Sequence, residues 1–224
     1  MEQRKKVAII VAGGSGTRMG SAVPKQFLEL AGKPVLWHTV NAFVQAYADM
    51  EIVLVLPEAH FSYVGEWIGD FKQVILVKGG ETRFNSVLNG LKTVQEPAVI
   101  FVHDGVRPMV SSALIHRCYE GAVVQGSAIP VIDMKDSIRE VVPNGNRAVD
   151  REQYKIIQTP QTFLSEWILP AFEQPFDPLF TDEATVVERQ GRQVQLVPGD
   201  EANIKITRPL DLTIAEALLG KRSE

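Results

Sequence analysis

The sequence predicts an α/β fold: a mostly parallel, Rossmann-like sheet with helices on both faces and a protruding antiparallel dimerisation arm. Two observations predict the sheet. Short apolar runs rich in β-branched residues alternate with segments of helical period, which is the pattern of right-handed βαβ units. These runs are also nearly continuous, as in strands that are buried on both faces. A third observation predicts the arm, because the alternation stops near Asp133.

The predicted elements follow one another along the whole chain, so we expect residues 1–224 to form a single domain. The apolar runs predict strands at 6–12, 51–56, 73–77, 98–102, 127–131 and 193–197. The segments of helical period predict helices at 35–47, 57–71, 83–94, 111–124, 181–190 and 209–219. Ligands of such sheets bind beyond the carboxyl ends of the strands, so the loops that follow the strands are the expected place for chemistry.

Residues 136–158 are predicted to form the arm. Two short stretches of β character flank the turn Pro143-Asn144-Gly145-Asn146, as in an antiparallel hairpin. An isolated hairpin with a polar tip is at best marginally stable in water. We therefore expect the arm to pack on a second copy of the chain, in a homodimer with shared active sites.

The composition excludes some classes of partner. A net charge of −4 gives no general basic field for nucleic acid or an anionic membrane, so any phosphate chemistry is local. No apolar run is long enough to cross a membrane, and the run that ends at Gly13 is too short for a usual signal peptide. The single cysteine, Cys118, is expected to be a buried apolar residue in a reducing compartment. The cytoplasm is therefore the expected location.

A glycine-rich segment, 13–16, directly follows the first predicted strand. Glycines allow a tight turn and bring backbone N–H groups against phosphate oxygens. A dinucleotide-binding fingerprint would need Gly or Ala where Met19 stands and an acidic residue where Leu56 ends the second strand. A Walker P-loop is excluded as well, because no Gly-Lys-Ser/Thr occurs. A simple connector between strand and loop is the alternative interpretation.

Two basic residues favour a phosphate site over a simple connector. Arg18 follows the glycines, and Lys25 lies a little further on within Pro24-Lys25-Gln26. A guanidinium binds phosphate as a planar fork, and an ammonium binds it as a mobile point charge. With the backbone N–H groups, these two cations would form a clamp for a triphosphate.

Acidic residues follow two further strands. Asp104 stands where a buried strand ends, a position suited to a hard cation that bridges phosphate oxygens, although it could instead cap the following turn. Glu81 follows Gly80 before a helix, where its carboxylate could accept from the exocyclic amine of cytosine or simply favour the helix N-terminus. The neighbouring His103 is expected to be structural, since the four histidines lack the spacing of a zinc site.

Five segments together resemble a known family of enzymes. They are 12–26 with Ala-Gly-Gly-x-Gly-Thr-Arg-Met and Pro-Lys-Gln, 79–87 with Gly-Gly-Glu-x-Arg-x-x-Ser-Val, 103–108 with His-Asp-Gly-Val-Arg-Pro, 149–161 with Val-Asp-Arg and Thr-Pro-Gln, and 203–209 with Asn-Ile-Lys-Ile-Thr-Arg-Pro. The first segment resembles the signature of sugar-phosphate nucleotidyltransferases. All five, in this order and spacing, resemble the 2-C-methyl-D-erythritol 4-phosphate cytidylyltransferases of the non-mevalonate isoprenoid pathway.

The resemblance implies transfer of CMP from CTP to a sugar-alcohol phosphate, with release of pyrophosphate and with Mg²⁺ or another hard divalent cation as cofactor. It implies that Arg18 and Lys25 are catalytic and that Asp104 is the metal ligand. The residues implied to bind the nucleotide are Ala12, Gly13, Gly14, Gly16, Gly80, Glu81, Ser86, Asp104 and Gly105. The residues implied to bind the acceptor are Arg107, Ser137, Arg151, Thr159, Thr181 and Lys205.

The sequence departs from the family pattern at two places. The stretch from Pro130 to Ser137 carries two additional residues, which shifts the register of Ser137. Ala202 stands where a polar or acidic residue is usual, which leaves Asp200 or Glu201 as a substitute.

Two other functions are consistent with parts of the pattern. A ribitol-5-phosphate cytidylyltransferase shares the glycine-rich loop and a segment like 103–108, whereas Val149-Asp150-Arg151 favours methylerythritol phosphate. A non-catalytic nucleotide sensor would keep the phosphate clamp but lose turnover. The presence of Arg18, Lys25 and Asp104 argues against a sensor.

Overall fold

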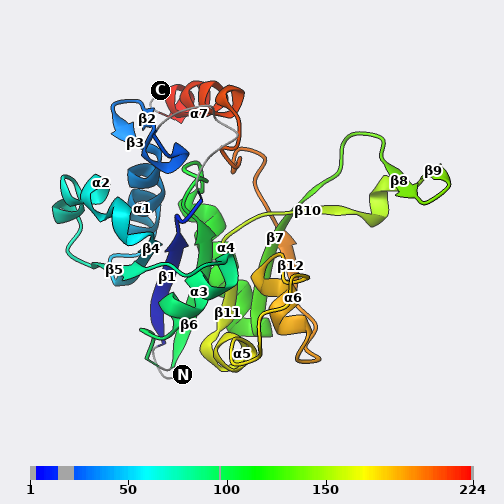
Figure 1. Cartoon of the computed structure of the whole chain (residues 1–224), viewed down its shortest axis with the longest axis horizontal. Coiled ribbons are helices and arrows are strands. Elements are labelled where there is room, and N and C mark those ends of the chain that lie inside the picture. Colours follow the sequence, from blue (N-terminus) through cyan, green and yellow to red (C-terminus); the bar gives the residue numbers. More distant parts are fainter. Residues whose placement is uncertain (1–3, 15–22, 96, 223–224) are drawn as a thin grey trace.

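The computed structural model describes residues 4–14, 23–95 and 97–222, which fold around an eight-stranded sheet (Figure 1). The strand order is β10-β7-β11-β6-β1-β4-β5, and β12 also pairs with β7. The bounds of these strands are β1 Lys5–Val11, β4 Met50–Leu56, β5 Val74–Lys78, β6 Ala98–Asp104, β7 Ser127–Asp133, β10 Lys155–Ile157, β11 Gln161–Leu164 and β12 Leu196–Pro198. All six predicted strands are therefore confirmed.

Four neighbouring strands, β6-β1-β4-β5, are parallel, as the near-continuous apolar runs predict. The register places Val11 opposite both Val55 and Asp104, so β1, β4 and β6 end at the same edge of the sheet. This edge carries the loops that hold the candidate site.

The sequence did not predict β11, which lies antiparallel between β6 and β7. Strands β10 and β11 pair one after the other with β7. Ile157 of β10 is opposite Val131, and Thr162 of β11 is opposite Ala128. Two additional residues therefore interrupt the pairing between β10 and β11, and they bring Thr159 close to the end of β6.

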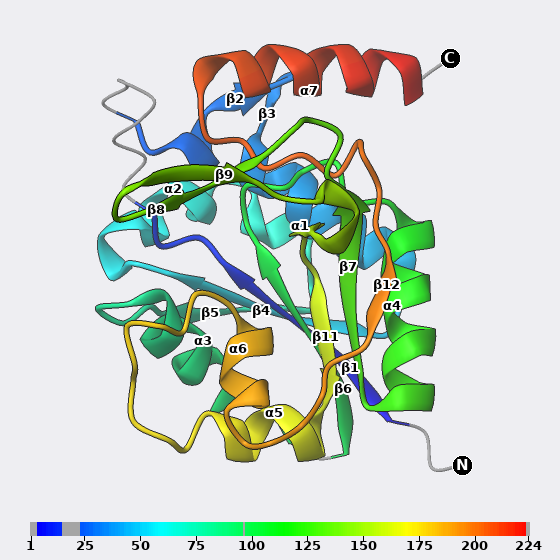
Figure 2. The same ribbon diagram turned by 90° about the vertical axis from the view of Figure 1, so that its right-hand side faces the viewer.

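Helices cover both faces of the sheet, as predicted (Figure 2). Ala8 and Ile10 of β1 pack on the side of α1 and α4, and Val7 and Ile9 pack on the side of α3, α5 and α6. The helix bounds are α1 Val35–Ala46, α2 Phe61–Gly65, α3 Arg83–Leu91, α4 Ser112–Gln125, α5 Ser165–Ala171, α6 Glu183–Glu188 and α7 Pro209–Arg222. None of these helices, in the described part of the chain, is long and apolar enough to span a membrane.

The helix predicted at 57–71 is wrong as one continuous element. Only short pieces form there: the 3-10 turns η3 (Glu58–His60) and η4 (Ile68–Asp70), with α2 between them. Gly65 ends α2 and Gly69 lies within η4, and glycine is a poor helix former because it gains so much freedom when the helix unwinds. The other predicted helices are confirmed, with shifts at their ends.

Cys118 is fully buried on α4, as predicted. Burial raises the pKa of its thiol to about 12. Helix α4 ends at Gly126, which has a φ of 87°. A Cβ at Gly126 would lie 2.3 Å from the Trp167 ring, so both backbone conformation and packing require glycine there.

The predicted hairpin is confirmed within residues 136–158. It consists of β8 (Arg139–Val142) and β9 (Gly145–Ala148), which pair only with each other and project far from the sheet (Figure 1). Near the start of the chain, β2 (Glu29–Leu30) and β3 (Lys33–Pro34) form a second small hairpin, against which α7 packs. The turn η2 (Lys25–Phe27) lies between β1 and this small hairpin, and η5 (Arg151–Gln153) lies in the arm.

Candidate active site

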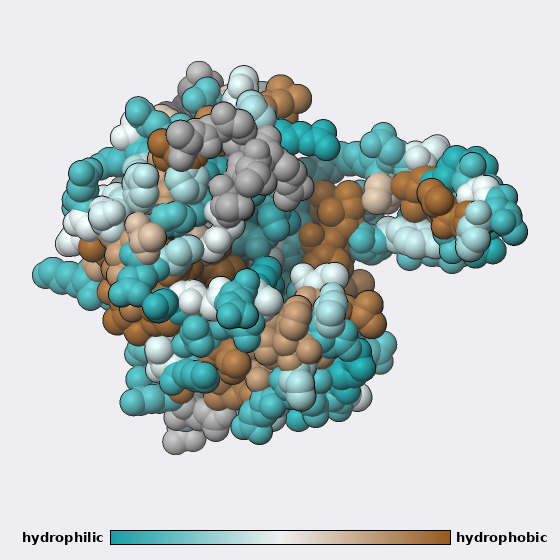
Figure 3. All heavy atoms as spheres, in the orientation of Figure 1, coloured by the Kyte–Doolittle hydropathy of each residue, from teal (hydrophilic) through white to brown (hydrophobic). Residues whose placement is uncertain are grey.

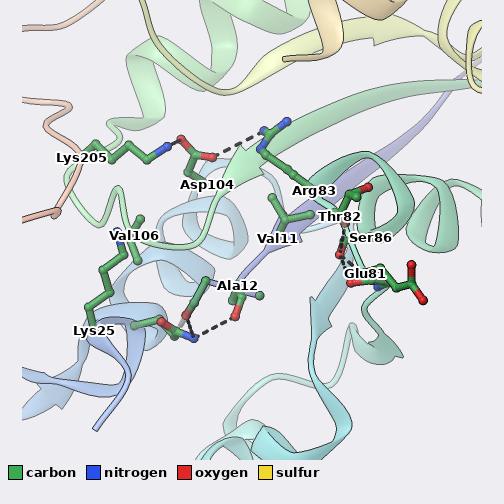
Figure 4. A pocket seen from close by; sticks show the side chains of 14 residues that line it. Val11, Ala12, Lys25, Glu81, Thr82, Arg83, Ser86, Asp104, Val106 and Lys205 are labelled. Atoms are coloured by element: carbon green, nitrogen blue, oxygen red, sulfur yellow. Dashed lines mark hydrogen bonds and ion pairs between the residues drawn. The ribbon is translucent and has the colours of Figure 1, made fainter. Parts of the chain in front are cut away.

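A cavity of about 310 Å³ lies at the edge of the sheet where β1 and β6 end (Figure 4). Its size is in the range of small-molecule sites. It is lined by Val11, Ala12, Gly13, Gly14, Lys25, Gln26, Gly80, Glu81, Thr82, Arg83, Ser86, Asp104, Val106 and Lys205. Segments from all over the sequence therefore meet at the edge where ligands of parallel sheets bind.

The glycine-rich loop and the turn that carries Lys25 are tied together by Gln26. The Gln26 side chain is 1% exposed, and its Nε2 donates to the carbonyls of Ala12 at 2.9 Å and Gly14 at 3.2 Å. On the other side of η2, Phe27 stacks on Tyr63 with ring centroids 4.6 Å apart. These contacts fix the buried Lys25 at the cavity wall.

The opposite wall is a tight turn at the start of α3. Thr82 caps this helix by accepting from the backbone N–H of Asn85. The Ser86 hydroxyl donates to the Thr82 carbonyl at 2.9 Å and accepts from the Gly80 N–H at 3.1 Å. A Cβ at Gly80 would lie 2.4 Å from the Asn85 Cβ, so only glycine fits this turn. In Figure 4, Glu81 and Ser86 lie across the cavity from Lys25 and Lys205.

Asp104 lies between these walls and is surrounded by cations. Its Oδ2 is 3.0 Å from Lys205 Nζ and 3.3 Å from Arg107 Nε, and its Oδ1 is 3.5 Å from Arg83 Nη2. Burial would raise the pKa of the Asp104 carboxyl, but the three cations outweigh burial and hold that pKa well below its usual range. Asp104 is therefore ionised at neutral pH.

A buried hydrogen-bond network holds the backbone of Asp104 on the side away from the cavity. The Thr159 hydroxyl accepts from the Asp104 N–H at 3.2 Å and pairs with His103 Nδ1 at 2.9 Å. His103 Nε2 faces the Arg107 carbonyl at 3.3 Å, so Nε2 carries the proton and Nδ1 accepts. Burial lowers the pKa of His103 to about 3, which keeps the ring neutral. His103 is structural, as predicted, and the Thr159 side chain belongs to the same network.

The predicted residues fall into four groups, and Thr159 lies apart from them in the network that supports Asp104. Gly16 and Arg18 lie outside the described residues. Gly105 and Arg107 lie beside the cavity: Gly105 packs closely on Ala12, and Arg107 contacts Asp104. Ser137, Arg151 and Thr181 are exposed and do not line the cavity. Arg151 is on the arm, where its Nη1 donates to the Lys135 carbonyl at 2.5 Å. The remaining predicted residues, except Thr159, line the cavity.

Five lining residues were not predicted as site residues: Val11, Gln26, Thr82, Arg83 and Val106. Gln26, Arg83 and Val106 stand within the quoted motifs, so the sequence did contain a signal for them. Arg83 is held by Glu183, which lies 100 residues further along the chain, and no local pattern predicts that contact. Val11 and Thr82 carry no sequence signal beyond their place next to motif residues.

The described residues include no group of three or more His, Cys, Asp or Glu side chains that could hold a metal ion alone. Asp104 nevertheless fits one mode of binding. Mg²⁺ is commonly held by one or two carboxylates together with substrate phosphates. The ionised Asp104 carboxylate, at the wall of a cavity that Lys25 and Lys205 also line, suits a cation that arrives with a polyphosphate.

Comparison with known proteins agrees with this geometry. The model of the IspD family, 2-C-methyl-D-erythritol 4-phosphate cytidylyltransferase, matches residues 6–221. Proteins of that name from Bacteroides fragilis and Porphyromonas gingivalis strain W83 are 49% and 48% identical to the chain, covering 96% and 98% of it and 99% of each relative.

Solved structures give the same result. A crystal structure of 4-diphosphocytidyl-2C-methyl-D-erythritol synthase from Anaerococcus prevotii superposes with a TM-score of 0.84 at 28% identity, over 97% of this chain and 96% of that one. The cytidylyltransferase from Thermus thermophilus gives 0.74 at 30% identity, over 95% and 98%. The chain belongs to the 2-C-methyl-D-erythritol 4-phosphate cytidylyltransferase family.

Proposed function

We propose that the chain transfers CMP from CTP to 2-C-methyl-D-erythritol 4-phosphate and releases pyrophosphate. The observation that carries this proposal is the division of the cavity into a cationic wall and a tight backbone turn, with Asp104 between them. A nucleoside triphosphate needs both walls, because its phosphates and its base differ in charge and shape. The names of the relatives indicate which base, cytosine, and which acceptor, 2-C-methyl-D-erythritol 4-phosphate, we assign to this cavity.

The chemistry needs no general base. The acceptor phosphate is already anionic at neutral pH, and its oxygen attacks the α-phosphorus of CTP in line with the departing pyrophosphate. One P–O bond forms as another breaks, so catalysis consists of positioning and of charge stabilisation. We assign that stabilisation to Lys25 and to Arg18, with the backbone N–H groups of the glycine-rich loop, 13–16, holding the outer phosphates.

The turn at 79–86 is our candidate for the base pocket. We assign recognition of the cytosine amine to the Gly80-Glu81 segment, and the shape of the turn to Ser86, whose hydroxyl bonds to the Gly80 N–H and the Thr82 carbonyl. Gly105 allows close packing on Ala12 at the opposite side of the cavity, because a Cβ at position 105 would lie 3.0 Å from the Cβ of Ala12. Ala12 would then form the floor beneath the nucleotide.

Asp104 is our candidate ligand for Mg²⁺. A bound Mg²⁺ would supply positive charge that offsets the negative charge of the phosphates of CTP. The Asp104 carboxylate contacts three cationic side chains. Lys205 is the most exposed of the three, with 41% of its side chain accessible, and is therefore the one best able to leave Asp104 for an incoming phosphate.

We propose that the acceptor phosphate binds Lys205 and Arg107 of one chain and Arg151 of a second chain in a homodimer. The hairpin exposes Val141 with 84% of its surface accessible, and apolar residues gather on the arm (Figure 3). Tyr154 and Ile157, near the base of the arm, are also exposed. Such a surface suits burial against a partner. Ser137, Thr159 and Thr181 remain our candidates for contacts to the acceptor.

A pyrophosphate-release assay tests the function. The purified chain is incubated with CTP, Mg²⁺ and either methylerythritol phosphate, ribitol 5-phosphate or no acceptor, and the product is identified by ³¹P NMR. We expect release only with methylerythritol phosphate, together with the two signals of a diphosphate diester. Faster release with ribitol 5-phosphate would reassign the acceptor. Binding of CTP without release with any acceptor would indicate a nucleotide sensor.

A further inference from the structure

Glu183 is a carboxylate with almost no access to solvent. The residue is 1% exposed at the start of α6, although it lies only one residue beyond Asp182, the N-cap of that helix. Both of its carboxylate oxygens bond to Arg83, one to Nη1 and the other to Nη2 at 3.1 Å. This bidentate pair joins α6 to α3 across 100 residues of sequence.

The position of Glu183 is fixed by the sheet. Gln161 of β11 donates to the Asp182 carboxylate at 2.9 Å and accepts from the Ala184 N–H at 2.8 Å. Asp182 and Thr185 form a capping box around the same turn. The first turn of α6 is thus anchored on both sides of Glu183, so Glu183 is a rigid support for Arg83.

Arg83 also reaches the cavity. Its Nη2 atom is 3.5 Å from Asp104 Oδ1, and Figure 4 shows the guanidinium facing Asp104. Among the described residues, the other two cations at Asp104, Lys205 and Arg107, both contact Oδ2. Arg83 is therefore the cation that contacts the Oδ1 side of this carboxylate.

Packing alone does not account for the pair. A buried ion pair is often no more stabilising than well-packed apolar side chains of the same volume, because both charges lose their hydration. An apolar pair at positions 83 and 183 would therefore fill the space equally well. An apolar side chain at position 83, however, would place no guanidinium against Asp104.

We propose that Arg83 and Glu183 are positioning residues: Glu183 holds the Arg83 guanidinium at the cavity wall, and Arg83 thereby fixes the orientation of the Asp104 carboxylate. This inference rests on the proposed function, because it assigns the pair to the site of nucleotidyl transfer. Neither residue is proposed to touch the reacting atoms.

Three variants separate positioning from support of the fold: Arg83→Met, Glu183→Leu and the double variant. Arg83→Met leaves the buried Glu183 charge unpaired, and Glu183→Leu leaves Arg83 with its longer contact to Asp104 at 3.5 Å, so we expect each to lower the Tm by roughly 10 °C. The double variant should regain most of this Tm. Its kcat should nevertheless remain at least about 10-fold below that of the wild type, because Oδ1 has lost its support and misplaced catalytic groups are costly.

The Arg4–Glu166 pair provides a control for the loss of an ion pair away from the cavity. It is also bidentate, with distances of 2.9 and 2.7 Å, but Glu166 lies at the start of α5, outside the cavity lining. Arg4→Met/Glu166→Leu should leave kcat unchanged. If kcat in the Arg83→Met/Glu183→Leu variant returned together with its Tm, the pair would be structural only and the inference would be wrong.

Two further measurements test the positioning role of Arg83 and Glu183 if the double variant is unstable or the pyrophosphate assay shows no activity. Glu183→Gln keeps the shape and removes the charge, so it should fold and show reduced kcat with little change in KM for CTP; unchanged kcat would overturn the inference. If the wild type itself releases no pyrophosphate, the proposed function fails. A crystal structure of Glu183→Gln then tests the inference independently: a reoriented Asp104 carboxylate supports it, and an unchanged one refutes it.

Discussion

The side-chain amide of Gln26 donates to the backbone carbonyl of Ala12 at 2.9 Å, and this contact joins the turn of a candidate catalytic lysine to the end of β1. The same Nε2 also reaches the Gly14 carbonyl at 3.2 Å. The Lys25 turn is therefore linked to the backbone at Ala12 and Gly14. The position of Lys25 therefore depends on the neighbouring Gln26, whose buried side-chain amide is a neutral hydrogen-bond donor.

Gln26→Glu should disrupt this link, because it places a carboxylate against two carbonyl oxygens in a site that is 1% exposed. We expect the free energy of unfolding at pH 7 to fall by about 2 kcal/mol and kcat to fall with it. Urea unfolding should show a smaller deficit at pH 5, because burial raises the pKa of such a carboxyl and its protonated form can donate again.

Gln174→Glu is the matched control for this change. Gln174 Nε2 also donates to two carbonyls, those of Ala171 at 2.7 Å and Val186 at 2.9 Å, but it is not part of the cavity lining. This variant should lose stability and keep its kcat. Equal losses of kcat in both variants would show that general destabilisation, rather than the link to Lys25, explains the effect.

Lys25→Ala should lower kcat by on the order of 10²-fold, because its charge is needed chiefly where negative charge accumulates in the transition state. The KM for the acceptor should change little. Steady-state kinetics with the exposed Lys72→Ala as control measures both values. A raised KM with unchanged kcat would remove Lys25 from the chemical step.

Asp104→Asn should keep the fold but lower the free energy of unfolding at pH 7 by about 2 kcal/mol, since three cations lose their shared anion. The pKa of Asp104 is lowered in the folded state, so its stabilisation is complete above the unfolded pKa and is lost as the pH falls. The difference from the wild type in urea unfolding should therefore be smaller at pH 3 than at pH 7.

The same variant tests the metal assignment. The Mg²⁺ concentration for half-maximal activity should rise, because an amide oxygen carries no full charge. A Mg²⁺ titration that overlays that of the wild type would remove Asp104 from the metal site. The stability difference would remain, since it depends only on the three ion pairs.

Base choice should favour CTP over UTP. A turn that accepts from the exocyclic amine of cytosine leaves that acceptor unmatched against the carbonyl of uracil, and sites of this kind discriminate strongly. The ratio of kcat/KM for the two nucleotides measures the effect. Equal values would show that the Gly80-Glu81 segment does not recognise the base.

Short sequence patterns predicted the strands and the glycine-rich segment, because these features depend on neighbouring residues in the sequence. The apolar runs of β1 and β6 and the glycines at 13–16 place the cavity at the correct edge of the sheet. Strand β11 could not be predicted in this way, because it has only four residues and begins with Gln161, whose polar side chain is satisfied by α6. The contact of Arg83 with Glu183 is also tertiary, so the sequence indicated the arginine but not its support.

Arg151 lies on the exposed arm, outside the lining of the cavity that contains Lys25 of the same chain. The shared-site proposal therefore assigns Arg151 to the partner's cavity and Lys25 to its own. Lys25→Ala and Arg151→Ala homodimers should each be nearly inactive. Mixing the two in one dimer distinguishes this arrangement from one in which both residues serve the same chain.

In a mixed dimer, the cavity of the Arg151→Ala chain keeps its own Lys25 and receives an intact Arg151 from the partner, while the other cavity lacks both. Random pairing of equal amounts makes about half of the dimers mixed, so co-expression should restore about a quarter of wild-type activity. Differently tagged chains allow the mixed dimer to be purified, and it should then show about half. If Arg151 served its own chain, each cavity would lack one of the two residues and no activity would return. An inactive purified mixed dimer would therefore refute the shared site.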